Sequence, residues 1–415
     1  MSLTDKAKKT LALVSLGCAK NAVDLQVRVG GMLKGDYTLS PDPDRADVVI
    51  VNTCSFIASA REEAEAEILR AVQLKKSGNY GRVVVSGCYP QRYPEALAKF
   101  PGVDEWLGVP AKWQKQQLPG FRLTGKAFAY LKIAEGCSHR CAYCAIPAIR
   151  GPFRSRPADD IVAEARVLVA SGCRELNIVA QDPMLYLSKS GGKKVRIEDL
   201  LRKIDEIEGD FWVRVLYSYP NEITDGFLGW MNTSPHAVKY IDVPLQHTVP
   251  EVLAKMNRSA AIEATLGAAK RLREAVEGVT LRTTIMTGFP GETPARFAKL
   301  LADIEEMSFD RLGAFAYSPE EGTAGAEMKG RPPKKTALER EREVMALAKK
   351  IWREKSRKML GKTYKALVIA PGVARMASQA PDVDGVTFVD ASAVGEFVEV
   401  RLEKVRGFDF EGVLA

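Results

Sequence analysis

The segment Ala129-Tyr-Leu-Lys-Ile-Ala-Glu-Gly-Cys-Ser-His-Arg-Cys-Ala-Tyr-Cys144 joins a short apolar run, typical of a β-strand, to three closely spaced cysteines. Cys137, Cys141 and Cys144 follow the spacing C-x-x-x-C-x-x-C. Thiolates are the ligands of iron–sulfur clusters, and a four-iron cluster normally takes four of them. Because this loop supplies only three, one iron would have no protein ligand and would be open to a substrate or cofactor. The spacing therefore predicts an iron–sulfur cluster with one open position.

The alternative for these cysteines is a zinc site completed by His139 or by a distant residue. Zinc motifs usually come as two C-x-x-C units, and this segment holds only one. The cluster is therefore the favoured interpretation, and we expect His139 to stand beside the cluster without being a ligand.

Beyond the cysteines, short β-rich runs alternate with helical stretches such as Asp159–Ser171, Arg196–Glu208 and Pro294–Met307. This alternation predicts a second α/β region that begins near Thr124. Six βα units indicate a partial (β/α)6 barrel, with its chemistry at the carboxyl ends of the strands. The predicted strands are Ala129–Ile133, Glu175–Val179, Trp212–Leu216, Tyr240–Val243, Thr280–Met286 and Arg311–Ala316.

Three segments in the first hundred residues share one pattern, in which an apolar run is followed by a small turn and a cysteine. Helix-like stretches, notably Ala60–Lys76, lie between them, so the pattern predicts an open parallel sheet. All three cysteines would then leave the carboxyl edge of that sheet, where such folds place their ligands. The runs are Leu11–Leu16, Asp47–Val51 and Arg82–Val85, and the cysteines are Cys18, Cys54 and Cys88.

The C-terminal part changes character after Pro332 and Pro333, which precede a long, densely charged helix over Thr336–Leu360. We interpret this helix as a solvated connector, with RNA contact as the alternative. Past Gly361, short strands and turns predict a small β-barrel. Its strands are expected at Tyr364–Ile369, Val386–Val389, Phe397–Val400 and Phe410–Leu414. The expected domains are residues 1–122, 123–333 and 361–415, with residues 334–360 as the connector.

The composition is that of an ordinary globular protein, with 415 residues, 46% hydrophobic residues and a net charge of +8. Seven cysteines are too few for a disulfide scaffold and fit a reducing compartment, with Cys173 as a core thiol. Lys6, Lys8 and Lys9 before Leu11–Gly17 imitate a short signal peptide, but the run is interpreted as a first strand. Since no long apolar window follows, we expect a cytoplasmic protein that does not span a membrane.

The cysteine loop, including Tyr143 before its last cysteine, is similar to the defining loop of radical S-adenosylmethionine (SAM) enzymes. Ser15–Asn21, Asn52–Cys54 and Ser86–Cys88 resemble the first domain of the methylthiotransferases in that superfamily. The C-terminal barrel resembles a TRAM domain, a small substrate-binding module. The resemblance implies two 4Fe-4S clusters and SAM as cofactors, the second cluster being held by Cys18, Cys54 and Cys88. The alternative for these three cysteines is a set of buried structural thiols.

The resemblance also implies candidate SAM contacts, although no catalytic residue is assigned. Thr287–Thr293 follows a predicted strand, and a tight βα turn is the alternative for its glycines. Gln181-Asp182 and Gln246-His247 each follow a strand and are as consistent with structural hydrogen bonding as with catalysis. Arg214 is a candidate for the SAM carboxylate, with a buried ion pair as the alternative. The proposed cofactor contacts are Tyr143, Gly288, Pro290, Gly291, Glu292, Gln181 and Arg214.

Several stretches resemble the branch of the family that modifies an aspartate of a ribosomal protein rather than a tRNA adenosine. Pro183 and Leu25-Gln26 depart from the pattern expected for that branch. From Lys362 to the C-terminus, six basic and eight acidic residues give a net charge of −2, so the remainder carries +10. An acidic barrel fits a basic protein partner better than tRNA phosphates. The stretches that resemble the protein-modifying branch are Arg150–Pro157, Ala180–Asp182, Leu216–Pro220, Asp242–His247 and Ala380–Gly385.

The implied activity is radical insertion of sulfur and a methyl group at the β-carbon of an aspartate, with two SAM molecules used per product. The ribosomal protein or ribosome would be the substrate, and flavodoxin or ferredoxin would be the one-electron reductant. The sulfur donor is left unassigned. A tRNA adenosine methylthiotransferase is the alternative within the class. A non-catalytic iron–sulfur electron carrier or RNA-binding protein is the alternative from a different class.

Overall fold

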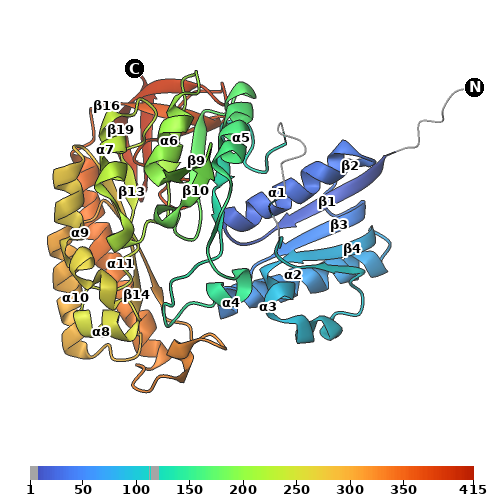
Figure 1. Ribbon diagram of the computed structural model, residues 1–415, viewed down its shortest axis with the longest axis horizontal. Helices are drawn as coiled ribbons and strands as arrows, with labels where there is room; N and C mark the ends of the chain where they lie inside the picture. The colour runs from blue at the N-terminus through green and yellow to red at the C-terminus, as the bar shows by residue number, and fades with distance from the viewer. Residues whose placement is uncertain (1–7, 112, 114–120) are drawn as a thin grey trace, which may run out of the picture. The chain divides into compact units, whose positions relative to one another are not determined.

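The structure is a computed structural model that describes residues 8–111, 113 and 121–415 (Figure 1). Lys6, part of the signal-like segment, lies outside the described residues. The chain forms two compact units. The first comprises the residues up to Leu123 together with Glu135–Ser138 and Cys144–Arg154, and the second comprises Thr124–Ala134, His139–Tyr143 and Ser155–Ala415.

The first unit is built on a five-stranded sheet in the order β2-β1-β3-β4-β5, and every neighbouring pair is parallel. The predicted open parallel sheet is therefore confirmed. The three-residue edge strands β2 and β5 were not predicted, because they are too short to show an apolar repeat. The elements are β1 (Lys9–Ser15), α1 (Ala19–Lys34), β2 (Tyr37–Leu39), β3 (Ala46–Thr53), α2 (Ala58–Lys76), β4 (Tyr80–Gly87), α3 (Cys88–Arg92), η1 (Pro94–Lys99), β5 (Glu105–Leu107) and α4 (Ile146–Arg150).

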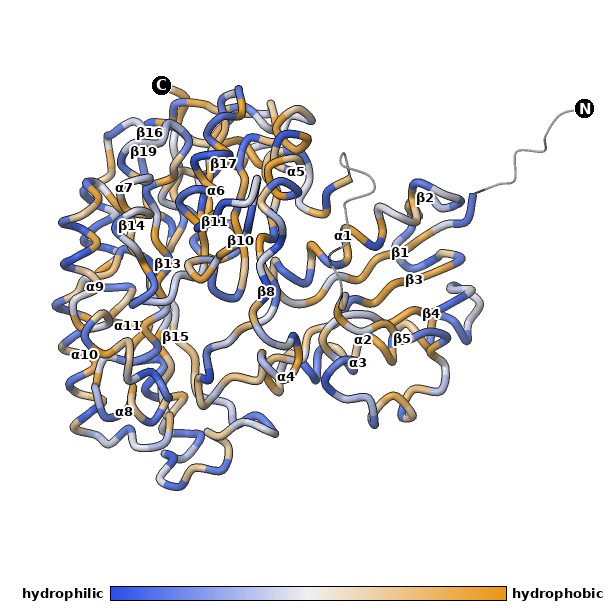
Figure 2. The backbone as a smooth tube through the Cα atoms, viewed as in Figure 1, coloured by the Kyte–Doolittle hydropathy of each residue, from blue (hydrophilic) through white to orange (hydrophobic). Residues whose placement is uncertain are grey.

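Both faces of this sheet are covered, which explains the continuous apolar runs in the middle of its central strands, Val48–Val51 in β3 and Val83–Val85 in β4. In β3, Val49 and Val51 belong to a core shared with Ile68 of α2. The alternate residue Ile50 packs instead with Val29 of α1. Successive side chains of a strand point to opposite faces, so α1 and α2 lie on opposite sides of the sheet. Figure 2 shows the hydrophobic middle of β3.

The second unit contains six parallel strands in two three-stranded sheets, β6-β9-β12 and β13-β14-β15. The isolated parallel bridge between Val213 and Ala237 links β12 to the segment before β13. This is the predicted partial (β/α)6 barrel. Its strands are β6 (Phe128–Lys132), β9 (Glu175–Val179), β12 (Trp212–Val215), β13 (Tyr240–Asp242), β14 (Thr280–Thr287) and β15 (Arg311–Ala316).

The remaining elements of this region cover the barrel or connect its strands (Figure 1). The α-helices are α5 (Ala158–Ala170), α6 (Ile197–Asp205), α7 (Asp225–Thr233), α8 (Pro250–Lys255), α9 (Ile262–Ala275) and α10 (Pro294–Met307). The 3-10 turns are η2 (Pro183–Leu185), η3 (Pro220–Glu222), η4 (Ser259–Ala261) and η5 (Ala324–Glu327). The short strands are β7 (Ala134–Glu135), β8 (Arg154–Ser155), β10 (Leu187–Ser190) and β11 (Lys193–Arg196).

The charged helix α11 (Lys334–Arg357) packs along β15, β14 and α10. Its buried face includes Val344, Ile351 and Trp352, and the Trp352 indole N–H donates to Gly407 O at 2.8 Å. The helix therefore joins the (β/α) barrel to the C-terminal β-barrel through an apolar face, although most of its residues are polar.

The C-terminal region is a closed five-stranded barrel in the order β16-β17-β18-β20-β19. Four of these strands overlap predicted ones, although β18 is shorter than the predicted Val386–Val389 and β19 extends six residues beyond the predicted Phe397–Val400. The fifth, β17, was missed, because it is a four-residue strand directly after a turn at Gly372. The strands are β16 (Thr363–Ala370), β17 (Val373–Met376), β18 (Thr387–Phe388), β19 (Phe397–Arg406) and β20 (Asp409–Leu414).

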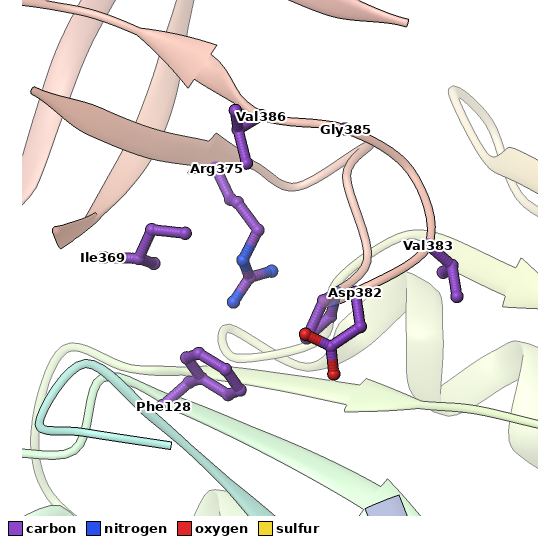
Figure 3. Close-up of a pocket in the computed structure, with 8 residues that line it drawn as sticks. Phe128, Ile369, Arg375, Asp382, Val383, Gly385 and Val386 are labelled. Carbon is purple, nitrogen blue, oxygen red and sulfur yellow. The ribbon is translucent and has the colours of Figure 1, made fainter. Parts of the chain in front are cut away.

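Buried ion pairs fasten this small barrel to the (β/α) barrel. Glu175 of β9 accepts from Arg214 Nε at 2.8 Å and also pairs with Arg375 of β17. Burial alone would raise the pKa of Glu175, but the guanidinium groups of Arg375 and Arg214 outweigh it and lower the pKa. Figure 3 shows Arg375 in a pocket that is also lined by Phe128 and Asp382, with its guanidinium 4.9 Å from the Phe128 ring centroid.

Two acidic residues of the loop that precedes β18 add further bonds to the (β/α) barrel. Asp382 accepts from the Tyr130 hydroxyl at 2.5 Å, and Asp384 pairs with Arg282 at 2.7 Å. Asp384 also accepts from the buried Tyr240 hydroxyl. The acidic residues of the small barrel are therefore partly used within the protein.

Replacing Glu175 with glutamine should destabilise the protein by about 3–5 kcal/mol, because two buried guanidinium groups lose their counter-charge. Urea unfolding measures this loss. The stabilisation from Glu175 should be complete above the ordinary pKa of glutamate and disappear as the pH falls through the lowered folded-state pKa.

Asp210→Asn is the matched control, because Asp210 and Lys365 also join the two barrels, at 2.9 Å, but are exposed. Exposed ion pairs contribute little, so this variant should unfold nearly as the wild type does. Equal losses in both variants would contradict a special role for the buried pair.

Candidate functional site

The first thiol set lies at the carboxyl edge of the parallel sheet, as the sequence predicts. Cys18 follows β1 and is the N-cap of α1, Cys54 follows β3, and Cys88 follows β4 as the first residue of α3. A Cβ at Gly17 would lie 2.9 Å from the Cys54 Cβ, so the turn before Cys18 runs directly against Cys54. The glycine at this position, with φ of +91°, allows that close approach.

The three thiols interact electrostatically, which places them in one neighbourhood. Burial raises the pKa of Cys88 to about 11, and Cys18 and Cys54 add to the rise while Arg150 opposes it. Burial also raises the pKa of Cys54. Cys18 is exposed, and partial desolvation by the surrounding protein is outweighed by Lys20, Arg150 and backbone N–H groups at the start of α1, so its pKa is lowered. A thiol at a helix N-terminus beside cations is suited to bind metal as a thiolate.

Arg150, at the end of α4, is a buried cation within this site, and the sequence indicated it only as part of a stretch with a family resemblance. Its Nη1 pairs with Asp24 at 3.0 Å and Glu135 at 2.9 Å. Its Nη2 lies 3.5 Å from Cys88 Sγ and 3.4 Å from Asn21 Oδ1.

Asn21 connects the cysteine-bearing turns of the sheet. Its side-chain N–H group donates to Leu16 O at 2.9 Å and to Thr53 O at 3.0 Å. Asn52 in turn donates to Asn21 O at 3.0 Å. These buried amides hold the turns after β1 and β3 in a fixed arrangement, which suits a rigid ligand set.

The second thiol set is divided between the two units, with Cys137 and Cys144 in the first and Cys141 in the second. All three are partly buried. Cys137 N donates to Gly151 O at 3.1 Å. Among the residues that the structure describes, no group of three or more Cys, His, Asp or Glu side chains has the arrangement of a formed metal site. The donor chemistry nevertheless fits an iron–sulfur cluster, for which thiolates are the usual ligands.

His139 makes contacts within the second unit that give it a structural role. Its Nε2 lies 2.7 Å from Asp182 Oδ2, and its ring stacks on Tyr219 with centroids 4.0 Å apart. Asp182 also caps the turn η2 by accepting from Met184 N at 3.1 Å. The interpretation of His139 as a neighbour of the cluster is compatible with these bonds and stays a prediction.

The turn that follows β14 is closed by Glu292. This buried carboxylate accepts from Gly288 N at 2.9 Å, Arg340 Nη1 at 2.6 Å and His247 Nε2 at 3.2 Å. Burial would raise its pKa, but the hydrogen bond from His247 and the other donors lower it. A Cβ at Gly288, where φ is +77°, would lie 2.3 Å from the Ala337 Cβ, so both the backbone conformation and the contact with α11 require glycine here.

The other predicted SAM contacts lie at different places in the second unit. Tyr143 packs edge-on against Phe289 of this turn, with ring centroids 6.3 Å apart. Gly291 has φ of +93°, which a side chain would disfavour. Gln181 follows β9 and is partly buried. Arg214 forms the buried ion pair that was the alternative to a SAM contact, and its Nη1 donates to Ala377 O at 2.7 Å.

Three family profiles match the chain in order along its length. They are Uncharacterized protein family UPF0004 over residues 10–108, the Radical SAM superfamily over residues 131–304 and the TRAM domain over residues 360–414. Among solved structures, the radical S-adenosylmethionine methyltransferase TsrM from Kitasatospora setae, with cobalamin and a 4Fe-4S cluster bound, is similar with a TM-score of 0.55. The match covers 77% of each chain at 16% identity, which supports the fold alone.

The fold and the family matches together define a radical SAM enzyme with a TRAM domain. The fold consists of a parallel sheet with three cysteines at its carboxyl edge, a six-stranded (β/α) barrel and a closed C-terminal barrel. The ribosomal protein uS12 methylthiotransferase RimO of Moorella thermoacetica is 41% identical, over 97% of this chain and 98% of the relative. The RimO protein of Geobacter sulfurreducens is 38% identical over 98% of each chain. The chain belongs to the RimO family of radical SAM methylthiotransferases.

Family membership confirms the predicted enzyme class, a SAM-dependent transferase, and with it the use of iron–sulfur chemistry and SAM. The predicted fold class is confirmed as well. Within the described residues, no helix has the length and apolar character needed to cross a lipid bilayer.

Replacing Gly136 with alanine should reduce iron binding by the second thiol set. The residue has φ of +75°, and a Cβ there would lie 2.2 Å from Pro152 O and 2.5 Å from Gly151 O. Because both obstacles are backbone atoms, the loop that carries Cys137 must move. Iron per chain after anaerobic reconstitution is the measurement.

Gly172→Ala is the control, since Gly172 has φ of +85° but a Cβ at this position would have no described atom within 4 Å beyond its chain neighbours. Both variants carry the backbone penalty of about 1–2 kcal/mol for a left-handed residue, so their difference isolates the collision. Equal iron content in the two variants would show that the collision does not disturb the cysteine loop.

Proposed function

We propose that this chain inserts sulfur and a methyl group at the β-carbon of an aspartate in ribosomal protein uS12. The observation that carries the proposal is its 36–41% identity, over 96–99% of the chain, to eight relatives named as uS12 methylthiotransferases. Two sets of three cysteines, each following strands of an α/β unit, support it independently.

Cys137, Cys141 and Cys144 would hold a 4Fe-4S cluster that, with SAM and one electron, supplies the radical for hydrogen abstraction. Cys18, Cys54 and Cys88 would hold a second 4Fe-4S cluster for the sulfur to be inserted. Their position at one sheet edge and the lowered pKa of Cys18 support this assignment. Arg150 would donate a hydrogen bond to Cys88, while Asp24 and Glu135 keep its guanidinium in place and balance its charge.

We assign the SAM contacts to residues around the turn after β14 and the neighbouring strand ends. In this proposal, Glu292 keeps the turn closed, so that its backbone presents Gly288, Pro290 and Gly291 to the cofactor. Tyr143 and Gln181 would add contacts from their own loops. Arg214 remains a candidate only through Nη2, which has no hydrogen-bond partner among the described residues.

The domain division at residues 122, 333 and 360 stays our proposal, as do a cytoplasmic location and a flavodoxin or ferredoxin as the reductant. The net charge of −2 on the small barrel supports a basic protein substrate over tRNA. Exposed Val383 and Phe388 on this barrel are available for such a partner.

A strain lacking this gene should contain uS12 without the methylthio group, because the proposed enzyme that adds this group to the aspartate would be absent. Mass spectrometry of uS12 and of tRNA nucleosides from the same cells makes the comparison. Loss of a methylthio group from tRNA adenosine, with uS12 unchanged, would favour the alternative within the class. A purified, reduced protein that forms no 5′-deoxyadenosine from SAM would favour a non-catalytic iron–sulfur protein.

The reconstituted wild type should hold about eight iron atoms per chain, since each four-iron cluster contributes four. A Cys18→Ala/Cys54→Ala/Cys88→Ala variant should hold about four, measured by iron analysis and electron paramagnetic resonance (EPR). Cys173→Ala is the matched control, because this buried thiol lies between α5 and β9 and belongs to neither set. A wild-type content near four would remove the second cluster.

A further inference from the structure

Two residues that follow α8 hold the backbone of the segment that carries Cys141. Met256 O accepts from Ala142 N at 2.9 Å. The side-chain amide of Asn257 donates to Arg140 O at 2.7 Å. Asn257 has φ of +58°, a left-handed conformation that asparagine tolerates better than most residues. Residues on both sides of Cys141 are thus bound to one short segment, Met256–Arg258.

The third residue of this segment, Arg258, brings a positive charge to the thiol itself. Its Nη1 lies 4.0 Å from Cys141 Sγ and 3.3 Å from the Tyr143 hydroxyl. Its Nη2 donates to Pro244 O at 3.0 Å, and its guanidinium carbon lies 4.1 Å from the Tyr219 ring centroid. Arg258 is only 3% exposed, so this charge is screened little by water.

Arg258 differs from Arg150 in how its charge is balanced. Arg150 touches Cys88 but is paired with two carboxylates, Asp24 and Glu135. Among the described residues, no carboxylate lies within ion-pair distance of Arg258, and its Nε has no hydrogen-bond partner. A buried charge without a counter-ion is costly, so an anion is expected beside it. The thiolate of Cys141 is in position to be part of that anion.

We infer that Arg258 raises the reduction potential of the cluster assigned to Cys137, Cys141 and Cys144, besides positioning Cys141. This inference rests on the proposed function. A four-iron cluster on three thiolates carries net negative charge, and one electron from an external donor adds another. A nearby fixed cation stabilises the reduced form more than the oxidised form, since net charge helps to set the potential. Arg258 would thus ease the one-electron reduction that this chemistry requires.

The test is an EPR-monitored titration with dithionite of the full chain that carries Cys18→Ala, Cys54→Ala and Cys88→Ala, so that one cluster remains. Arg258→Met should shift the midpoint potential to a more negative value at unchanged iron content. Arg258→Lys should retain most of the wild-type potential, because it keeps the charge. An Arg258→Met variant with the wild-type potential would overturn the inference.

Asn257→Gly is the matched control, because it removes the neighbouring bond to Arg140 O, tolerates a positive φ and changes no charge. Its midpoint potential should change less than that of Arg258→Met, because the Arg258 charge remains. If Arg258→Met cannot hold the cluster, Arg258→Lys decides. A midpoint potential of the lysine variant close to that of the parent supports the inference, and a clearly more negative midpoint despite the retained charge overturns it. Loss of the cluster in both variants also overturns it, because Arg258 would then have only a packing role. Thermal unfolding of the cluster-free proteins checks that each variant is folded.

These results separate the two proposals. Absence of any cluster at Cys137, Cys141 and Cys144 in the parent protein would remove the proposed function itself. If the cluster binds and its midpoint reduction potential does not change in Arg258→Met, the proposed function stands. Only the role assigned to Arg258 would then be removed.

Discussion

The shared direction of β1, β3 and β4 is the constraint on which the first thiol set depends. Parallel strands joined by helices end at the same edge, so the turns that carry Cys18, Cys54 and Cys88 become neighbours. Packing on both faces keeps this register, because a slip of one residue would exchange the side chains that face α1 with those that face α2. The arrangement of the ligands therefore follows from the same contacts that stabilise the sheet.

Several buried arginines in the described residues connect separate elements of the fold. Arg150 joins Cys88 to two carboxylates, and Arg340 joins the turn at Glu292 to α11. Arg214 and Arg375 share Glu175 between the two barrels of the second unit. Each guanidinium offers several donors in a rigid plane, so one side chain can connect several elements. Burying a guanidinium costs free energy because the charge is removed from water. Its main benefit is therefore a defined arrangement of the elements and not added stability.

Much of the fold could be predicted because its central strands are long enough to show their pattern. Strands β9 and β15 and helix α10 coincide with the predicted Glu175–Val179, Arg311–Ala316 and Pro294–Met307. The hairpin of β10 and β11 and the strand β17 were missed, since short exposed or turn-bound strands carry no apolar repeat. Arg258 was missed because its contact with Cys141 spans more than a hundred residues of chain.

The sequence by itself determined the kind of chemistry, since the type and spacing of cysteines define which metal group they suit. It also determined the order of the α/β and β-barrel regions through alternating apolar runs. Only the tertiary structure decided which charges meet, such as Glu175 with Arg375 or Arg258 with Cys141. The physical reason is that an ionic contact depends on burial and on partners distant in the chain, and neither exists until the chain has folded.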